Sequence, residues 1–164
     1  MAKIESQQPL VPSVLDRLID EDPGATRETP KSRTQVLREL KLSVRRDLEN
    51  LLNSRWRATS WPENLEDLEL SLVNYGIPDI TSARMSAAQS REELRRIVEV
   101  VIRRFEPRFK TVSVELLDNA EPLDRTLRFR INALLHAEPA PEPVVFDSAL
   151  QPVTGNVEVK RSAR

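Results

Sequence analysis

The sequence predicts an α+β fold in which helices pack on one face of a small antiparallel β-sheet with a C-terminal β-hairpin. Two observations lead to this prediction. Before Pro107 apolar residues recur at helical spacing, and after it they alternate with polar residues, as in half-buried strands. A chain of 164 residues is long enough for one domain with a sizeable core. We therefore expect a flexible N-terminal arm, residues 1–31, followed by a single domain, residues 32–164.

The arm contains one short amphipathic helix. Residues 12–19 (PSVLDRLI) place Val14, Leu15 and Leu18 on one helical face. A helix of this length is marginal alone in water, so its apolar face needs a surface to pack on. The sequence leaves open whether that surface is the core of the chain itself or a groove on a partner.

Two longer helices are predicted from apolar stripes. The first runs from about Ser32 to Asn53. Its apolar stripe is Val36, Leu37, Leu40, Val44, Leu48 and Leu51, whereas Leu42 points away from this stripe. The last helix begins at a capping box with Ser90 at its N-cap. Its stripe is Leu94, Ile97, Val98, Val101, Ile102 and Phe105. Between them a shorter helix is suggested by Leu65, Leu68, Leu72 and Tyr75, and Gly76 closes it.

Four strands are predicted after Pro107. Val112, Val114 and Leu116 alternate with polar residues, and a second alternating run contains Leu127, Phe129, Ile131 and Ala133. Residues 118–124 (DNAEPLD) form the turn between these runs, so the two strands should pair antiparallel. Residues 137–143 are rich in proline and predict an extended spacer. Residues 144–150 and 156–160 then predict a hairpin around residues 154–155.

The composition excludes several classes of function. The net charge is −1 and aromatic residues make up 4% of the chain, which gives no general attraction or stacking surface for nucleic acid. Without cysteine there is no thiol catalysis and no disulfide. The three glycines are far apart, so a phosphate-binding glycine loop is excluded. A single histidine, His136, cannot build a zinc site. We expect no metal and no cofactor.

The location of the protein in the cell is predicted from two kinds of segment that the sequence lacks. The N-terminus has no apolar stretch typical of a secretory signal, and no apolar run approaches the ~20 residues that cross a bilayer. We expect a soluble, cytoplasmic protein.

The most informative segment is residues 103–109 (RRFEPRF), where the helical pattern changes to the strand pattern. Pro107 cannot continue a helix, so Glu106 and Arg108 are presented at a stiff corner. One interpretation is structural: the positive charge of Arg108 interacts with the last carbonyl groups of the helix, and Glu106 pairs with Arg108 at the surface. The other is that the pair contacts a partner. Local physics alone favours the first.

Catalysis is not expected at this corner. A glycoside hydrolase would need Glu106 in an apolar pocket, which raises the pKa of a carboxyl, and a second carboxylate nearby. Glu106 instead lies among arginines, which favour the charged form and lower the pKa. We therefore assign no catalytic residue.

The C-terminal hairpin raises a question about its edge. Its strand-forming residues are Val144, Phe146, Val157 and Val159. A hairpin at the margin of a sheet exposes unpaired backbone groups, which an incoming strand can use. The alternative is an ordinary edge hairpin that Lys160 and Arg161 protect.

Several segments, in order, resemble one protein family. They are residues 51–55 (LLNSR), 71–79 (SLVNYGIPD), 102–109 (IRRFEPRF) and 127–131 (LRFRI), followed by the hairpin. Together they are similar to the GPW-like family of baseplate wedge proteins, found in type VI secretion systems and contractile phage tails. The likeness covers roughly residues 32–160. Residues 13–18 (SVLDRL) resemble the arm of the type VI members, and Phe109 stands where leucine is more usual.

The resemblance implies a structural role rather than an enzymatic one. It implies docking on other wedge subunits (TssF, TssG and TssK), with Glu106, Pro107 and Arg108 contacting the core of the wedge. It also implies that the sheet templates polymerisation of the contractile sheath (TssB and TssC) by β-strand addition, in a baseplate assembled at the inner membrane.

From the residues and the resemblance we expect ten partner-binding residues. They are Glu106, Pro107 and Arg108 at the corner, Val14, Leu15 and Leu18 in the arm, and Val144, Phe146, Val157 and Val159 in the hairpin. The alternatives are a phage-type wedge protein and a lysozyme-like glycoside hydrolase.

Overall fold

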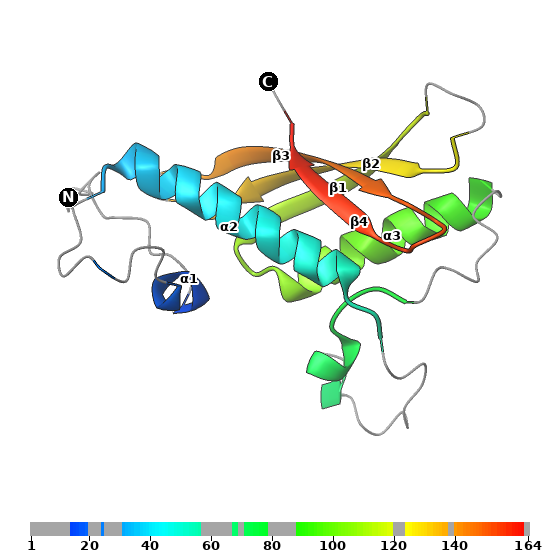
Figure 1. Cartoon of the computed structure of the whole chain (residues 1–164), viewed down its shortest axis with the longest axis horizontal. Helices are drawn as coiled ribbons and strands as arrows, with labels where there is room; N and C mark the ends of the chain where they lie inside the picture. The colour runs from blue at the N-terminus through cyan, green and yellow to red at the C-terminus, as the bar shows by residue number, and fades with distance from the viewer. Residues whose placement is uncertain are drawn as a thin grey trace.

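The computed structural model describes residues 14–19, 24, 31–56, 67–68, 71–78, 88–119, 124–137 and 140–162. Its elements are α1 (Val14–Leu18), α2 (Arg33–Asn53), η2 (Leu72–Asn74), α3 (Ala88–Phe105), β1 (Phe109–Leu117), β2 (Leu127–Leu135), β3 (Glu142–Leu150) and β4 (Val157–Arg161). Both long helices lie on the same face of the sheet (Figure 1). The predicted α+β fold is confirmed.

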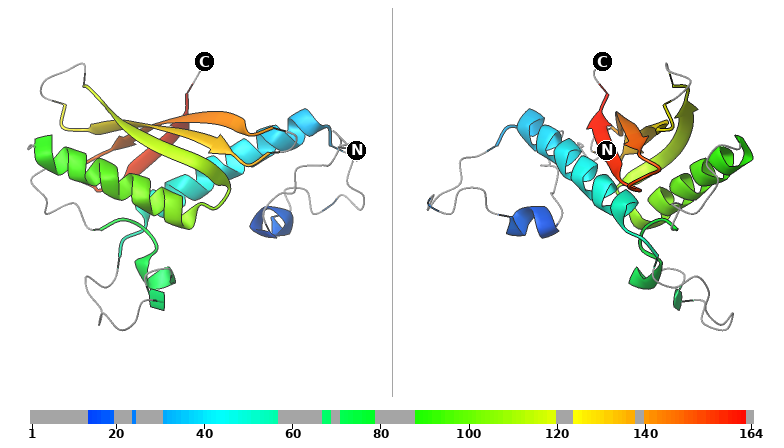
Figure 2. Two further views of the ribbon diagram at one scale, coloured as in Figure 1. Left: turned by 180° about the vertical axis from the view of Figure 1, so that it is seen from behind. Right: turned by 45° about the vertical axis from the view of Figure 1, so that its right-hand side comes forward.

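The sheet is a four-stranded antiparallel meander in the order β1-β2-β3-β4. Both predicted hairpins are therefore confirmed, and Figure 2 shows how the twisted sheet lies over the two helices. Ile131 in β2 connects the two hairpins, because it pairs with Val114 on one side and with Phe146 on the other.

The predicted spacer is shorter than expected, because β3 begins at Glu142 and includes Pro143. The C-terminal hairpin is thus not separated from the central strands. Alternate residues of an antiparallel strand direct their backbone groups to opposite neighbours. The Ser162 N–H donates to the Val145 carbonyl (3.1 Å), so Val145 and Pro143 face away from β2. Proline is tolerated here because β2 requires no N–H from that position.

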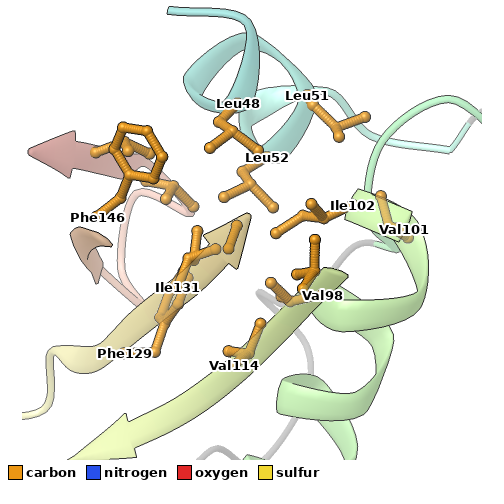
Figure 3. Close-up of a cluster of buried hydrophobic side chains, with 14 of the residues drawn as sticks. Leu48, Leu51, Leu52, Val98, Val101, Ile102, Val114, Phe129, Ile131 and Phe146 are labelled. Atoms are coloured by element: carbon orange, nitrogen blue, oxygen red, sulfur yellow. The ribbon is translucent and has the colours of Figure 1, made fainter. Parts of the chain in front are cut away.

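The core lies between the helices and the sheet. Figure 3 shows Leu48, Leu51 and Leu52 of α2 meeting Val98, Val101 and Ile102 of α3, over Val114, Phe129, Ile131 and Phe146 of the strands. All of these side chains are buried. The stripe of α3 is confirmed, and that of α2 is confirmed from Leu40 onward; Val36 and Leu37 are half-buried and lie outside the core. Leu42 is 49% exposed, in agreement with its predicted place off the stripe.

The capping box lies on α2 rather than on α3. The Ser32 hydroxyl accepts from the Gln35 N–H (3.3 Å), and the Gln35 side chain accepts from the Ser32 N–H (2.8 Å). The prediction at Ser90 is wrong, because α3 begins at Ala88. Alanine and glutamine are good helix formers, so the helix extends past the serine.

In its described part the predicted short helix is 3₁₀ rather than α, at residues 67–68 and at Leu72–Asn74, and Leu72 is 85% exposed. Leu65 lies outside the described residues. The stop at Gly76 is confirmed: its φ is +107°, and a Cβ there would lie 2.4 Å from the Ser54 carbonyl oxygen. This close approach lets Ile77 donate its N–H to the same oxygen (3.0 Å) at the end of α2.

Within the described ranges, no helix has the length and apolar character to span a membrane. The same residues contain no group of three or more histidine, cysteine or carboxylate side chains placed to hold a metal ion.

Candidate functional site

The corner between α3 and β1 is built by residues 106–108. The Glu106 N–H makes the last helical bond, to the Ile102 carbonyl (2.9 Å). Pro107 has no N–H to continue the helix, and the Phe109 N–H donates instead to the Glu106 carbonyl (3.2 Å). The Arg108 carbonyl accepts from the His136 N–H (2.8 Å), which ties the corner to the end of β2.

Glu106 is buried at this corner, with 5% of its surface exposed. Its two carboxylate oxygens accept from Arg108 Nε (2.6 Å) and Nη2 (2.5 Å), a bidentate arrangement. The pairing of the two side chains is as expected, but the exposed presentation is wrong. The turn at Pro107 folds the guanidinium back over the carboxylate, which removes Glu106 from solvent.

Arg108 also reaches α2. Its Nη2 donates to Asp47 Oδ2 (2.7 Å), and its Nη1 donates to the Ser43 hydroxyl (3.2 Å). Burial alone would lower the pKa of Arg108, but the hydrogen bonds and charges of Glu106 and Asp47 outweigh it and raise that pKa. The cation is therefore held between two anions and keeps 23% of its side chain exposed.

The arm joins the same cluster through Asp16 of α1. Asp16 Oδ2 accepts from the Ser43 hydroxyl (2.6 Å), and Oδ1 accepts from Arg46 Nη2 (2.7 Å). The Arg46 guanidinium also contacts Asp47 (3.2 Å). We call this set the corner network. Its members are Asp16, Ser43, Arg46, Asp47, Glu106 and Arg108.

The apolar face of α1 does not pack on the core. Val14 is 73% exposed, Leu18 is 75% exposed, and Leu15 and Ile19 are about half exposed. Of the two alternatives for this face, packing on the core of the chain is thus not observed. Among the side chains that the structure describes, the hydrogen bonds from α1 to α2 are made by the carboxylate of Asp16.

Tyr75 borders the corner network. Its ring makes an edge-to-face contact with Phe105, with ring centroids 5.5 Å apart. Burial raises the pKa of the Tyr75 hydroxyl, and the negative charges of Asp47 and Glu106 raise it further. The phenol is therefore neutral and supplies a polar edge beside the paired charges.

The hairpin residues expected to bind partners are buried. Val144, Phe146, Val157 and Val159 each expose at most 6% of their surface and face the helices. Their side chains build the core, so a contact with a partner at these positions would have to use the backbone.

The backbone of β4 is itself covered by α2. The Val157 N–H donates to Asn53 Oδ1 (2.8 Å) and its carbonyl accepts from Asn53 Nδ2 (2.8 Å). The Val159 N–H donates to Glu49 Oε1 (3.4 Å) and its carbonyl accepts from Arg45 (3.2 Å). The expectation of unpaired groups at these two valines is wrong. Asn53, Glu49 and Arg45 follow one another at i, i+4 spacing and so lie along one side of the helix.

The opposite edge of the sheet is covered in the same way by α3. The Val114 N–H donates to Glu99 (3.3 Å), and its carbonyl accepts from Arg95 (3.2 Å). Arg103 donates to the carbonyl of Val112 (3.2 Å). The i, i+4 spacing of Glu99 and Arg103 indicates an ion pair, and the structure contains it (2.9 Å). The two side chains of this pair also cover the β1 edge of the sheet. The sequence analysis did not predict that side chains of α2 and α3 cover the two edges of the sheet, although their i, i+4 spacing was a visible signal.

The site does not provide what a glycoside hydrolase requires. Both oxygens of Glu106 are engaged with a guanidinium, whereas a general acid needs an apolar setting. A small apolar cavity lies elsewhere, between Leu52, Ile77 and Leu150, and no carboxylate lines it.

The family described as "Baseplate wedge protein gp25" matches residues 38–140, more than half of the chain. The protein therefore belongs to this family of baseplate wedge proteins.

Two further comparisons concern solved structures and curated protein sequences. A solved chain of "The baseplate complex from the type VI secretion system" is similar to this one, with 20% identity and a TM-score of 0.47. The match covers 70% of this chain and 96% of that chain. Among curated protein sequences, none matches.

Proposed function

We propose that this protein is the type VI secretion wedge subunit TssE, which docks on the other wedge subunits and templates the sheath. Membership of the baseplate wedge family supports the structural role. The likeness of residues 13–18 to the type VI arm favours secretion over a phage tail. The proposal includes TssF, TssG and TssK as wedge partners, TssB and TssC as sheath partners, and assembly in the cytoplasm at the inner membrane.

The observation that carries the docking proposal is the preorganised cation at the corner. Arg108 is held by Glu106 and Asp47 while 23% of its side chain stays exposed. A side chain already fixed in place loses little conformational entropy on binding, which favours a specific contact. Pro107 is exposed beside it, so a partner that approaches the corner meets a rigid surface.

The exposed apolar face of α1 supports a second contact. Val14, Leu15 and Leu18 together form an apolar strip on one turn of helix, and burial of such a strip in a groove is a common mode of recognition. We assign this strip to a groove on a wedge subunit. Because more than half of each of these side chains is exposed in the isolated chain, their burial in a groove would contribute to binding.

The sheath proposal has to fit a sheet whose edges are covered at Val157, Val159 and Val114. β4 ends at Arg161, opposite Phe146, so β3 continues beyond it. We place strand addition on this continuation, next to Val144 and Val145. Val145 faces away from β2, and its carbonyl already accepts from the Ser162 N–H (3.1 Å), so an incoming strand would pair with the Val145 N–H on this outer side.

Reconstitution with purified wedge subunits tests the docking proposal. The full chain should be captured by the wedge subunits, and a chain that lacks residues 1–24 should bind more weakly with nearly unchanged stability. A glycoside hydrolase would instead release soluble fragments from peptidoglycan. A phage-type protein would fail to bind any type VI subunit, and that result would overturn the assignment.

A further inference from the structure

The corner network contains one residue that does not come from the folded domain. Asp16 lies in the arm, 27 residues before Ser43 and 30 before Arg46 in the chain, and it contacts both. Its side chain is 13% exposed although the helix that carries it is largely in solvent. The arm therefore reaches the corner with one partly buried carboxylate.

The position of Asp16 is close to the group proposed to dock. The Ser43 hydroxyl that donates to Asp16 also accepts from Arg108 Nη1 (3.2 Å). Arg46, the other partner of Asp16, contacts the same Asp47 that holds Arg108. One side chain, Ser43, thus separates the arm from Arg108 along the first route, and two, Arg46 and Asp47, separate them along the second.

The contact that holds the arm is polar and reversible by nature. The structure shows α1 bound to α2 through Asp16, while Val14 and Leu18 remain about three quarters exposed. Contacts between partly exposed charges are weakened by salt and water, so a segment held by them is released easily. A helix that packed its apolar face on the domain would be held far more firmly.

We propose that α1 is an internal competitor for the corner: Asp16 holds the arm over the Ser43–Arg46 side of the Arg108 site until a wedge subunit takes its place. This inference rests on the proposed docking function and adds a regulation of the same site. Arrival of the partner replaces the Asp16 contacts, and the released α1 can then move its apolar strip, which is already exposed, into a groove of that partner. The loss of the Asp16 contacts is thus common to both binding events, which couples them.

The coupling has a defined thermodynamic consequence. If the arm covers the corner for most of the time, the affinity for a partner is reduced by the fraction of chains whose corner is free. Removing the Asp16 contacts without removing the apolar strip should therefore tighten binding. Removing the whole arm should weaken it, because the strip is lost as well.

The test uses the full chain with the conservative substitution Asp16→Asn. The matched control is Glu39→Gln, which removes an exposed carboxylate of α2 whose ion pair is with Lys31 (2.9 Å), outside the corner network. Affinity for the purified wedge subunits is measured by titration. Asp16→Asn should bind about threefold to tenfold tighter than the natural chain, and Glu39→Gln should bind as the natural chain does.

A second measurement follows the arm directly. Because the chain has no cysteine, spin labels can be placed at Ile19→Cys and Asn50→Cys without other changes. The free chain should show one short label distance, which Asp16→Asn broadens and which binding of the wedge subunits lengthens. An unchanged distance in Asp16→Asn, a distance that persists in the complex, or an unchanged affinity would each overturn the inference alone. Absence of binding by every variant would overturn the docking function and the inference with it.

Discussion

The carboxylate of Glu49 on α2 accepts the outward N–H of Val159 on the edge strand β4 (3.4 Å). A helix side chain thus occupies the place that a further strand would take. Glu99 on α3 does the same for Val114 on the opposite edge (3.3 Å). Exposed strand edges promote unwanted pairing between chains. In this protein α2 and α3 each bury the apolar face of the sheet and also cover one of its edges.

The edge contacts predict a specific loss of stability for Asn53→Ala. Asn53 donates to and accepts from the backbone of Val157, which is 4% exposed. The substitution leaves both backbone groups without these partners, so the free energy of unfolding should fall by about 1–3 kcal/mol. Urea denaturation measures it. The control Asn50→Ala, at an exposed site on the same helix, should change it by less than about 0.5 kcal/mol. Equal effects would contradict the role of Asn53.

The corner pair predicts a larger loss. Glu106→Ala leaves Arg108 partly buried beside a single anion, and removal of one partner from a buried pair costs roughly 3–5 kcal/mol. Thermal unfolding should show the decrease. Glu39→Ala removes an exposed pair and should have little effect. If Glu106→Ala unfolds at the temperature of the natural chain, the pair does not stabilise the fold and its contribution is confined to binding.

The solvent face of the sheet predicts a pH dependence. A hydrogen bond from Arg130 (2.7 Å) lowers the pKa of the Asp147 carboxyl. A lowered pKa stabilises the fold above the pKa of the unfolded carboxyl, about 3.9, and this stabilisation is lost as the pH falls through the folded pKa.

Asp147→Asn should therefore reduce stability at neutral pH, by less than about 1 kcal/mol because both side chains are more than a third exposed. The difference from the natural chain should vanish below about pH 3. Denaturation at a series of pH values measures it. A difference that stays constant with pH would show that the ion pair is not its source.

The sheath proposal predicts a selective effect of Val145→Pro. Val145 directs its backbone away from β2, so proline removes a donor that the β2–β3 ladder does not use. Sheath polymerisation should stop while wedge binding survives. Proline at Val157 or Val159 is less informative, because Asn53 and Glu49 already hold those N–H groups. Normal sheath assembly by Val145→Pro would exclude strand addition at this position.

The sequence alone predicted the elements whose signal is local. Leu48 and Val98 follow the 3.6-residue repeat of a helix, and Ile131 follows the two-residue repeat of a strand, so their burial could be inferred from their neighbours in the chain. The stop at Gly76 was equally local. The start of α3 was not, because the pattern at Ser90 is compatible with a helix that begins earlier.

Only the tertiary structure decided the state of the polar side chains. Arg108 meets Asp47 across 61 residues of chain, and Asn53 meets Val157 across 104. No repeat in the sequence encodes such distances, because hydrogen bonds depend on which surfaces the packed helices bring together. For this reason the sequence located the corner and the hairpin. The packing of α2 against the sheet decided that both are buried, that the sheet edge is covered, and that Asp16 contacts the corner.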